Sequence, residues 1–301
     1  MWGRFEEALK KRNLAFTKNA PTAPLCSFRI GGTCRFLLRP ACLGELVDAV
    51  ALCRTSAVPY LVVGRGSNLL FPDGVLERAV ISTAALDGVQ PTAAGFVAQC
   101  GVSLPRLARL AAAAGYADLA FAAGIPGTVG GAAVMNAGAW GGEMSDVVKS
   151  VKAYFPDENS VRTVFNNELN YSYRNSVFKG VNAVVLSVEL AFSKPTEPDA
   201  VRREMRALSA RRAATQPLNL PSAGSAFRRP SQDVPLAKIF DELGLQGLRI
   251  GNAAVSEKHA GFIVNLGGAT ACDVRLLLEK IADITEAHCG FRPEPEVIVL
   301  S

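Results

Sequence analysis

Apolar residues recur at helical spacing in two stretches near the start of the chain. Met1–Leu14 mixes charged and apolar residues as an amphipathic helix does. In Leu43–Cys53, four apolar residues share one helical face, namely Leu43, Leu46, Val47 and Val50. Three short apolar runs predict strands. They are Phe36–Leu38, Tyr60–Val63 and Ala79–Ser82.

Beyond Asp87 the pattern changes to short apolar runs broken by glycine, which predict strands. These strands are Phe96–Gln99, Val148–Tyr154, Val161–Phe165 and Ala183–Leu190. A single helical pattern, Leu104–Ala114, lies among them. We therefore expect an α+β region in which loops rather than helices carry the special residues.

The last third of the chain follows a proline-containing junction, Lys194–Pro198, which is typical of a domain boundary. We expect helices at Val201–Ala214, Leu236–Leu243 and Asp273–His288 after it. Strands are predicted at Phe262–Asn265 and Val297–Leu300. The whole chain therefore belongs to the α+β class, and we find no internal repeat in it.

The composition is typical of a globular protein, since 49% of the 301 residues are hydrophobic and 20% are charged. The net charge of +5 suits an anionic small molecule as well as nucleic acid. Aromatic residues are not interleaved with the arginines, so we expect no nucleic-acid partner. No stretch looks like a signal peptide or a membrane span. We expect a cytoplasmic protein without a membrane or obligate protein partner.

The seven cysteines are odd in number and do not form closely spaced pairs, which fits reduced thiols. Cys26, Cys34 and Cys42 are evenly spaced, but the chain contains only His259 and His288 as histidines. We therefore expect no bound metal and interpret these cysteines as small buried residues.

Two glycine-containing segments are candidate ligand sites. Gly64–Asn68 directly follows a predicted strand, so its N–H groups could bind an anion, although glycines after strands are more often plain turns. Ala123–Glu143 is richer in glycine and has apolar rather than polar spacers, which argues against a flexible linker. Such a run lets the main chain approach a flat ring closely.

Three further segments carry polar candidates. Arg174 stands between Tyr173 and Asn175 and could pair with a carboxylate or stabilise a developing negative charge, although a structural ion pair is the common alternative. Ser225 lies on a small-residue turn, and its hydroxyl could donate a proton to a substrate. The default explanation for a serine there is a local hydrogen bond in a turn or a helix cap. Near the end, Arg292–Val297 holds the carboxylates Glu294 and Glu296.

In this order the segments resemble the UDP-N-acetylenolpyruvoylglucosamine reductase family, over nearly the whole chain from Ser27 to Leu300. The chain is short between Tyr173 and Pro221, so it looks like the form that lacks the tyrosine loop over the uracil. The resembling pieces are Ser27–Gly32, Gly64–Leu70, Ile125–Glu143, Tyr173–Phe178, Pro221–Phe227, Val255–His259 and Pro295–Val297.

The resemblance implies a vanillyl-alcohol-oxidase-type FAD-binding fold of two subdomains, 1–83 (completed by 292–301) and 84–195, plus an α+β substrate-binding domain, 200–291. It implies noncovalent FAD, and the Gly124–Gly142 run indeed has no histidine or cysteine that could attach it. The implied cofactor-binding residues are Gly64, Gly66, Ser67, Asn68, Leu69, Gly124, Ile125, Pro126, Gly127, Thr128, Gly130, Gly131, Ala132, Asn136 and Gly138.

The resemblance also implies an activity, in which NADPH reduces the FAD and then leaves, and the enolpyruvyl ether of a UDP-sugar is reduced next. Arg174 and Glu296 would stabilise the negative charge on the substrate carboxylate, and Ser225 would be the general acid. Glu296 is preferred to Glu294 because the family's acidic residue directly precedes the valine of the last strand. Implied substrate contacts are Tyr173, Arg229, Lys238 and His259.

One departure concerns the substrate diphosphate, where the family often has an asparagine and this chain has Arg229, a cation of different geometry. Two other functions remain open. A flavin oxidase of the same cofactor fold would use oxygen and an unrelated substrate. A nucleotide-binding module would bind without catalysis.

Overall fold

The computed structural model describes residues 1–231 and 234–301. The chain forms two compact units. Unit 1 comprises residues 1–18, 36–64 and 78–211, and unit 2 comprises residues 19–35, 65–77 and 212–301. The finer boundaries predicted from the resemblance, near residues 83 and 195, stay a prediction.

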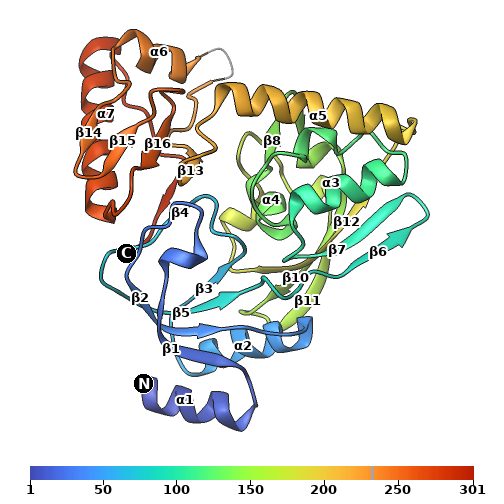
Figure 1. The fold of residues 1–301 in the computed structure, drawn as a ribbon. Coiled ribbons are helices and arrows are strands. Elements are labelled where there is room, and N and C mark those ends of the chain that lie inside the picture. The colour runs from blue at the N-terminus through green and yellow to red at the C-terminus, as the bar shows by residue number, and fades with distance from the viewer. Residues whose placement is uncertain (232–233) are drawn as a thin grey trace. The chain divides into compact units, whose positions relative to one another are not determined.

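The first sheet has the strand order β1-β2-β5-β3. Its strands are β1 (Phe16–Pro21), β2 (Thr33–Leu38), β5 (Val75–Ser82) and β3 (Tyr60–Val63), and β3 and β5 run parallel. Helices α1 (Trp2–Lys11) and α2 (Leu43–Thr55) pack on one another in unit 1 (Figure 1). The predicted amphipathic pattern explains α1, because Phe5 and Leu9 are its fully buried residues.

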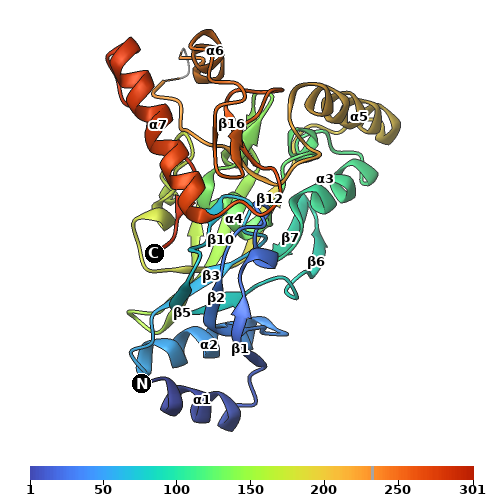
Figure 2. The same ribbon diagram turned by 60° about the vertical axis from the view of Figure 1, so that its left-hand side comes forward.

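The second sheet lies in unit 1 and is antiparallel, with the order β11-β10-β12-β7-β6. Its strands are β6 (Val89–Thr92), β7 (Gly95–Gln99), β10 (Val148–Phe155), β11 (Ser160–Phe165) and β12 (Val184–Ala191). Helix α4 (Val129–Met135) lies over β7 and β12, and α3 (Leu104–Ala113) lies near it (Figure 2). A short hairpin, β8 (Gly138–Ala139) and β9 (Gly142–Glu143), follows α4, and the long helix α5 (Pro198–Thr215) ends the unit.

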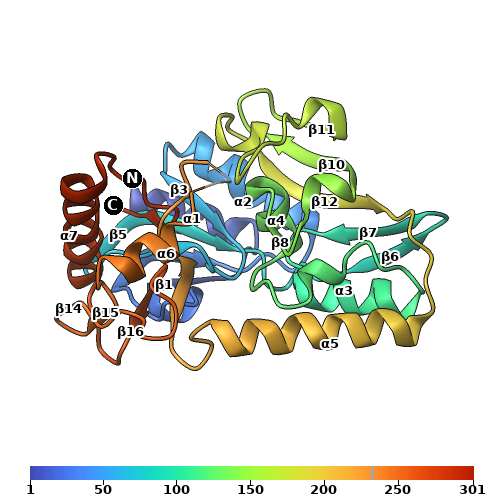
Figure 3. The ribbon, with the colours of Figure 1, turned by 90° about the horizontal axis from the view of Figure 1, so that it is seen from above.

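Unit 2 contains a four-stranded sheet of order β13-β16-β15-β14. Its strands are β13 (Ser222–Ser225), β14 (Arg249–Ile250), β15 (Ala253–Val255) and β16 (Phe262–Asn265). Helix α7 (Ala271–Cys289) packs beside β14 and β15, and α6 (Leu236–Glu242) completes the unit (Figure 3). The last strand, β17 (Ile298–Val299), pairs in parallel with β4 (Leu69–Leu70).

The start of α7 is fixed by two carboxylates. Thr270 and Asp273 form a reciprocal capping box. Asp73, from the loop before β5, accepts hydrogen bonds from the N–H groups of Ala271 (2.6 Å) and Cys272 (3.0 Å). The first four N–H groups of a helix have no acceptor within the helix, and Asp73 accepts hydrogen bonds from two of them. Asp73 thereby links the loop before β5 to the start of α7.

The structure confirms the α+β class and most predicted elements, but three local expectations are wrong. The glycine-rich run is not a continuous loop, because α4 lies within it. The segment expected to be a turn at Ser225 is the end of strand β13. Cys42, expected to be buried like Cys26 and Cys34, is exposed at the start of α2. Strand β1 was missed, because Ala20 is its one buried residue and the alternating pattern of a half-buried strand is absent.

Candidate functional site

The two glycines after β3 are required by close approach of the chain to itself. A Cβ on Gly64 would lie 2.2 Å from Thr128 Oγ1, within unit 1. Gly66 has a positive φ of 55°, and a Cβ there would lie 2.2 Å from the carbonyl oxygen of Leu25, within unit 2. Both glycines are thus explained by packing and backbone conformation. The structure brings Gly64 and Thr128, two predicted cofactor residues, into contact.

Helix α4 begins inside the glycine-rich run at Thr128, whose hydroxyl oxygen accepts a hydrogen bond from Gly131 N at 3.4 Å. Gly130 packs on Cys100, since a Cβ there would lie 2.8 Å from Cys100 Cβ. Ala132 is buried, and Pro126 is exposed. The run is therefore anchored to the second sheet on one side.

Two other glycines of the run have open space beside them instead of packing contacts. At Gly131, a Cβ would meet nothing closer than Thr128 Oγ1 at 3.6 Å, and at Gly141 it would meet nothing within 4 Å. Main chain without a covering side chain is what close approach of an FAD ring requires. The half-buried residues Gly124, Ile125 and Gly127 precede α4, and the carbonyl of Gly127 accepts a hydrogen bond from Leu104 N at 3.2 Å.

Arg174 lies at the tip of a tight turn that the glycine-rich run holds. Ser172 and Asn175 exchange two backbone hydrogen bonds, of 3.2 and 3.1 Å, which close the turn around Tyr173 and Arg174. The guanidinium donates to the carbonyl oxygens of Gly138 (2.9 Å) and Asn136 (3.4 Å) and lies 5.0 Å from the Tyr173 ring centroid. Carbonyl oxygens carry no formal charge, so the contribution of these two bonds is to orient the guanidinium.

Arg174 has a φ of 53°, in the left-handed region that glycine and asparagine usually occupy. This conformation costs a residue with a Cβ about 1–2 kcal/mol. Strain at a non-glycine residue that points a charge is a common sign of a functional position.

Ser225 and Glu296 are neighbours in unit 2. The chain at Ser225–Arg228 pairs with the chain at Glu294–Glu296 through Glu296 N to Ala226 O (2.9 Å) and Arg228 N to Glu294 O (2.9 Å). The hydroxyl of Ser225, which is exposed, donates to the carbonyl oxygen of Phe227 at 3.2 Å. Glu296 is half-buried, whereas Glu294 is exposed.

Asn68 connects the segment after β3 to the chain at Glu296. Its side-chain amide donates to the carbonyl oxygen of Glu296 at 3.0 Å, and its carbonyl accepts from Ile298 N at 2.9 Å. Leu69 pairs with Ile298 in the parallel β4–β17 ladder, and Ser67 is half-buried beside them. The structure thus brings Asn68, Ser225 and Glu296 together within unit 2.

The predicted substrate contacts of unit 2 differ in their surroundings. His259 is half-buried against the Phe262 ring, at 4.9 Å between centroids, and burial lowers the pKa of its imidazole. Its Nδ1 accepts from Gly261 N at 3.2 Å, so the neutral ring carries its proton on Nε2. Lys238 is exposed, 3.6 Å from Glu242, and Arg229 is also exposed. His259 is near Ser225, because Phe262 pairs with Ser225 in the sheet.

Sequence reasoning missed the role of Ser176 beside Arg174, and it placed Asn136 among the cofactor-binding residues. Ser176, which is buried, donates from its hydroxyl to the carbonyl oxygen of Val134 at 2.7 Å. Asn136 is fully buried and bonds to the backbone of Ser172 and Ser145. An amide within the small and apolar run was the signal for Asn136, because a buried amide needs hydrogen-bond partners. Ser176 lies outside that run, and no local pattern indicated it.

No helix within the described residues 1–231 and 234–301 has the length and apolar character needed to cross a bilayer.

Comparisons with known proteins agree over nearly the whole chain. Residues 34–163 match the FAD binding domain model, and residues 216–300 match that of the UDP-N-acetylenolpyruvoylglucosamine reductase C-terminal domain. The reductase of Caldicellulosiruptor bescii is 38% identical over 294 residues, 97% of this chain and 93% of that protein. The reductase of Latilactobacillus sakei is 39% identical over 94% of this chain and 92% of its own length.

A solved structure is also similar. The crystal structure of UDP-N-acetylenolpyruvylglucosamine reductase from Thermus caldophilus superposes with a TM-score of 0.79 at 31% sequence identity, and the match covers 96% of this chain and 99% of that one. Together with the FAD binding domain match, this confirms the vanillyl-alcohol-oxidase-type FAD-binding fold. The chain belongs to the UDP-N-acetylenolpyruvoylglucosamine reductase family.

Proposed function

We propose that this protein is a cytoplasmic reductase that converts UDP-N-acetylglucosamine enolpyruvate to UDP-N-acetylmuramate for peptidoglycan synthesis, with NADPH as reductant and noncovalent FAD as electron carrier. The observation that carries the proposal is one chain that combines the FAD binding domain with the C-terminal domain of this reductase family. The flavin oxidase alternative accounts for the first domain alone. The same combination disfavours a binding module without catalysis.

The reaction saturates a carbon–carbon double bond, so two electrons and a proton reach one carbon and a second proton reaches the other. Bound FAD would supply the two-electron chemistry between NADPH and the double bond, and the Gly124–Gly138 part of the glycine-rich run would hold it. Negative charge then builds on the neighbouring carboxylate. The fixed guanidinium of Arg174 stabilises that charge, and Glu296 orients the groups around it.

Ser225 donates the proton to the carbon next to the carboxylate. Its hydroxyl is exposed and bonds to the Phe227 carbonyl at the end of β13, from which rotation about χ1 releases it toward a ligand. A serine is a weak acid, but the carbanionic carbon of an enolate is a strong base. We assign substrate contacts to Tyr173, Arg229, Lys238 and His259, with the Nε2–H of neutral His259 as a donor.

The substitution Ser225→Ala tests this function. The purified variant should be yellow, and anaerobic NADPH should bleach its flavin at the rate of the parent protein. Return of the colour on addition of the enolpyruvyl nucleotide should slow by about 10²- to 10⁴-fold, as loss of a positioned proton donor predicts.

Two comparisons make the result interpretable. Ser225→Cys keeps an ionisable proton and should recover part of the rate, while Ser160→Ala, in the β10–β11 hairpin, should change neither step. Equal slowing of both steps in Ser225→Ala would contradict the role of Ser225. Rapid oxidation of the reduced flavin by oxygen, with no response to the nucleotide, would favour an oxidase instead.

A further inference from the structure

Asn136 occupies the point where α4 ends and its backbone turns to the left-handed region, with a φ of 43°. Asparagine tolerates this conformation better than other residues with a Cβ. Its side chain is 0% exposed. A cofactor or substrate therefore has no access to the amide of Asn136.

Both ends of that amide are bonded to the main chain of other segments. Nδ2 donates to the carbonyl oxygen of Ser172 at 3.1 Å, and Oδ1 accepts from Ser145 N at 2.9 Å. The backbone carbonyl of Asn136 in turn accepts from the Arg174 guanidinium at 3.4 Å. Asn136 thus fixes Ser172, the first residue of the turn, through its side chain. Its backbone carbonyl also accepts a hydrogen bond from Arg174 at the tip of the turn.

Ser176 fixes the other end of the same turn. Its hydroxyl donates to the carbonyl oxygen of Val134 in the last turn of α4 at 2.7 Å, and its side chain is buried. The segment Ser172–Ser176 is therefore tied to the end of α4 on both sides of Arg174. This arrangement over-determines the turn, which is how a strained left-handed residue is kept in place.

We propose that Asn136 is a positioning residue, which acts on the substrate through Arg174 and not by contact between its side chain and the cofactor. The inference rests on the proposed function, since it takes Arg174 as the group that stabilises the substrate carboxylate. A small displacement of such a group costs much, because a misplacement of about 1 Å can slow a reaction about 10²-fold.

The test is a double-mutant cycle with Asn136→Gly, Arg174→Ala and both together. Glycine accepts the left-handed backbone and removes only the amide bonds. In Asn136→Gly the reoxidation of the reduced flavin by enolpyruvyl nucleotide should slow by about 10- to 100-fold, with bleaching by NADPH within about 2-fold and the flavin retained. In the Arg174→Ala background, Asn136→Gly should cause no further loss, because its effect passes through that arginine.

Asn159→Gly is the matched control. Asn159 is also left-handed, with a φ of 49°, and accepts a hydrogen bond from Tyr154 at 2.9 Å in the β10–β11 hairpin. It should leave both steps unchanged. Ser176→Ala, which keeps every backbone feature, provides a second test if Asn136→Gly does not fold, and it should also slow reoxidation alone.

Three results separate the possible failures. If Asn136→Gly releases the flavin or slows both steps equally, Asn136 serves the cofactor or the fold and the inference is wrong. If its effect persists undiminished in the Arg174→Ala background, it does not act through Arg174. If Arg174→Ala alone leaves reoxidation unchanged, the proposed role of Arg174 fails and the inference falls with it.

Discussion

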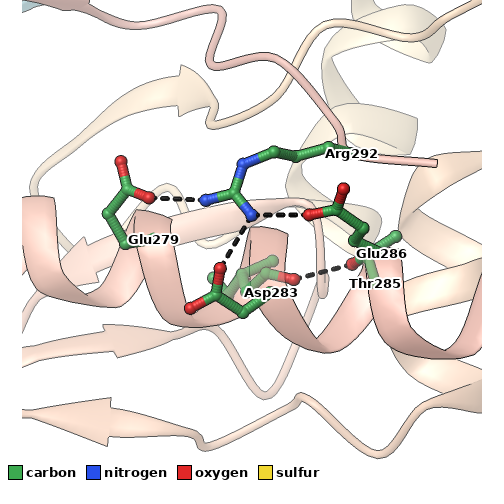
Figure 4. A network of polar contacts seen from close by, with 6 residues as sticks. Glu279, Asp283, Thr285, Glu286 and Arg292 are labelled. Carbon is green, nitrogen blue, oxygen red and sulfur yellow. Dashed lines mark hydrogen bonds and ion pairs between the residues drawn. The ribbon is translucent and has the colours of Figure 1, made fainter.

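Arg174 and Arg292 both donate hydrogen bonds from the guanidinium, the first to main-chain carbonyls and the second to side-chain carboxylates. Arg174 donates to the neutral carbonyl oxygens of Asn136 and Gly138. Arg292, which follows α7, donates to three carboxylates of that helix, those of Glu279 (2.6 Å), Asp283 (2.7 Å) and Glu286 (2.8 Å) (Figure 4). The two carbonyl bonds orient the Arg174 guanidinium, whereas the three carboxylates also form ion pairs with Arg292.

The backbones of the two arginines differ as well. Arg174 is half-buried and left-handed, at the tip of a turn. Arg292 follows the left-handed Gly290, which ends α7 and turns the chain back along the helix. Its carboxylate partners are 54–71% exposed, and these ion pairs raise its pKa. Bonds to main-chain carbonyls at a strained turn therefore set Arg174 apart from Arg292, whose bonds are ion pairs on the exposed surface of α7.

Substitution of each arginine by lysine should give the largest difference. Lysine keeps the charge but lacks the planar fork that reaches two carbonyls at once. Arg174→Lys should slow reoxidation of the flavin by enolpyruvyl nucleotide by about 10²-fold, the typical cost of one misplaced charge-stabilising donor. Arg292→Lys should leave it unchanged, because an ammonium group can still serve clustered carboxylates. Stopped-flow absorbance of the flavin measures both, and equal effects would remove the distinction.

The periodicity of apolar residues was sufficient to predict the long helix that carries the three carboxylate partners of Arg292. Helix α7 was predicted at Asp273–His288 and spans Ala271–Cys289, since its apolar residues repeat regularly. Helix α4 could not be predicted, because two of its residues are glycines, each costing about 1 kcal/mol in a helix interior. Tertiary hydrogen bonds, which Val129 N donates to Val102 O and Gly130 N donates to Cys100 O, outweigh that preference.

The family resemblance predicted which residues belong to the candidate site. It did not predict their geometry. No local pattern indicates that Ala226 bonds to Glu296, because strand pairing over such a sequence separation depends on the fold. Nor does the sequence Tyr173-Arg174 suggest that Arg174 is left-handed, because that conformation is usual for glycine and asparagine. The grouping of Arg174 with Ser225 and Glu296 around one substrate stays a prediction.

Substitution of each arginine by alanine and by glycine tests how much the left-handed backbone of Arg174 costs in stability. At Arg174 both changes remove the guanidinium, but glycine accepts the positive φ without strain. Arg174→Gly should therefore be more stable than Arg174→Ala by about 1 kcal/mol, or about 2–4 °C in Tm. At Arg292 the order should reverse or vanish, because its φ is not positive and glycine adds disorder to the unfolded chain. Differential scanning calorimetry of the four variants checks this order.

The smallest expected effect concerns the carboxylates that Arg292 holds. Arg292→Met leaves Glu279, Asp283 and Glu286 on one face of α7, where like charges at such spacing repel. The Tm should fall by about 1–3 °C at low salt and by less at high salt, because exposed charges are screened by ions. Thermal melts of Arg292→Met and of the parent protein at two ionic strengths measure this difference. A salt-independent loss in Arg292→Met would mean that packing of the arginine stem, and not neutralisation of the three carboxylates, is what this residue contributes.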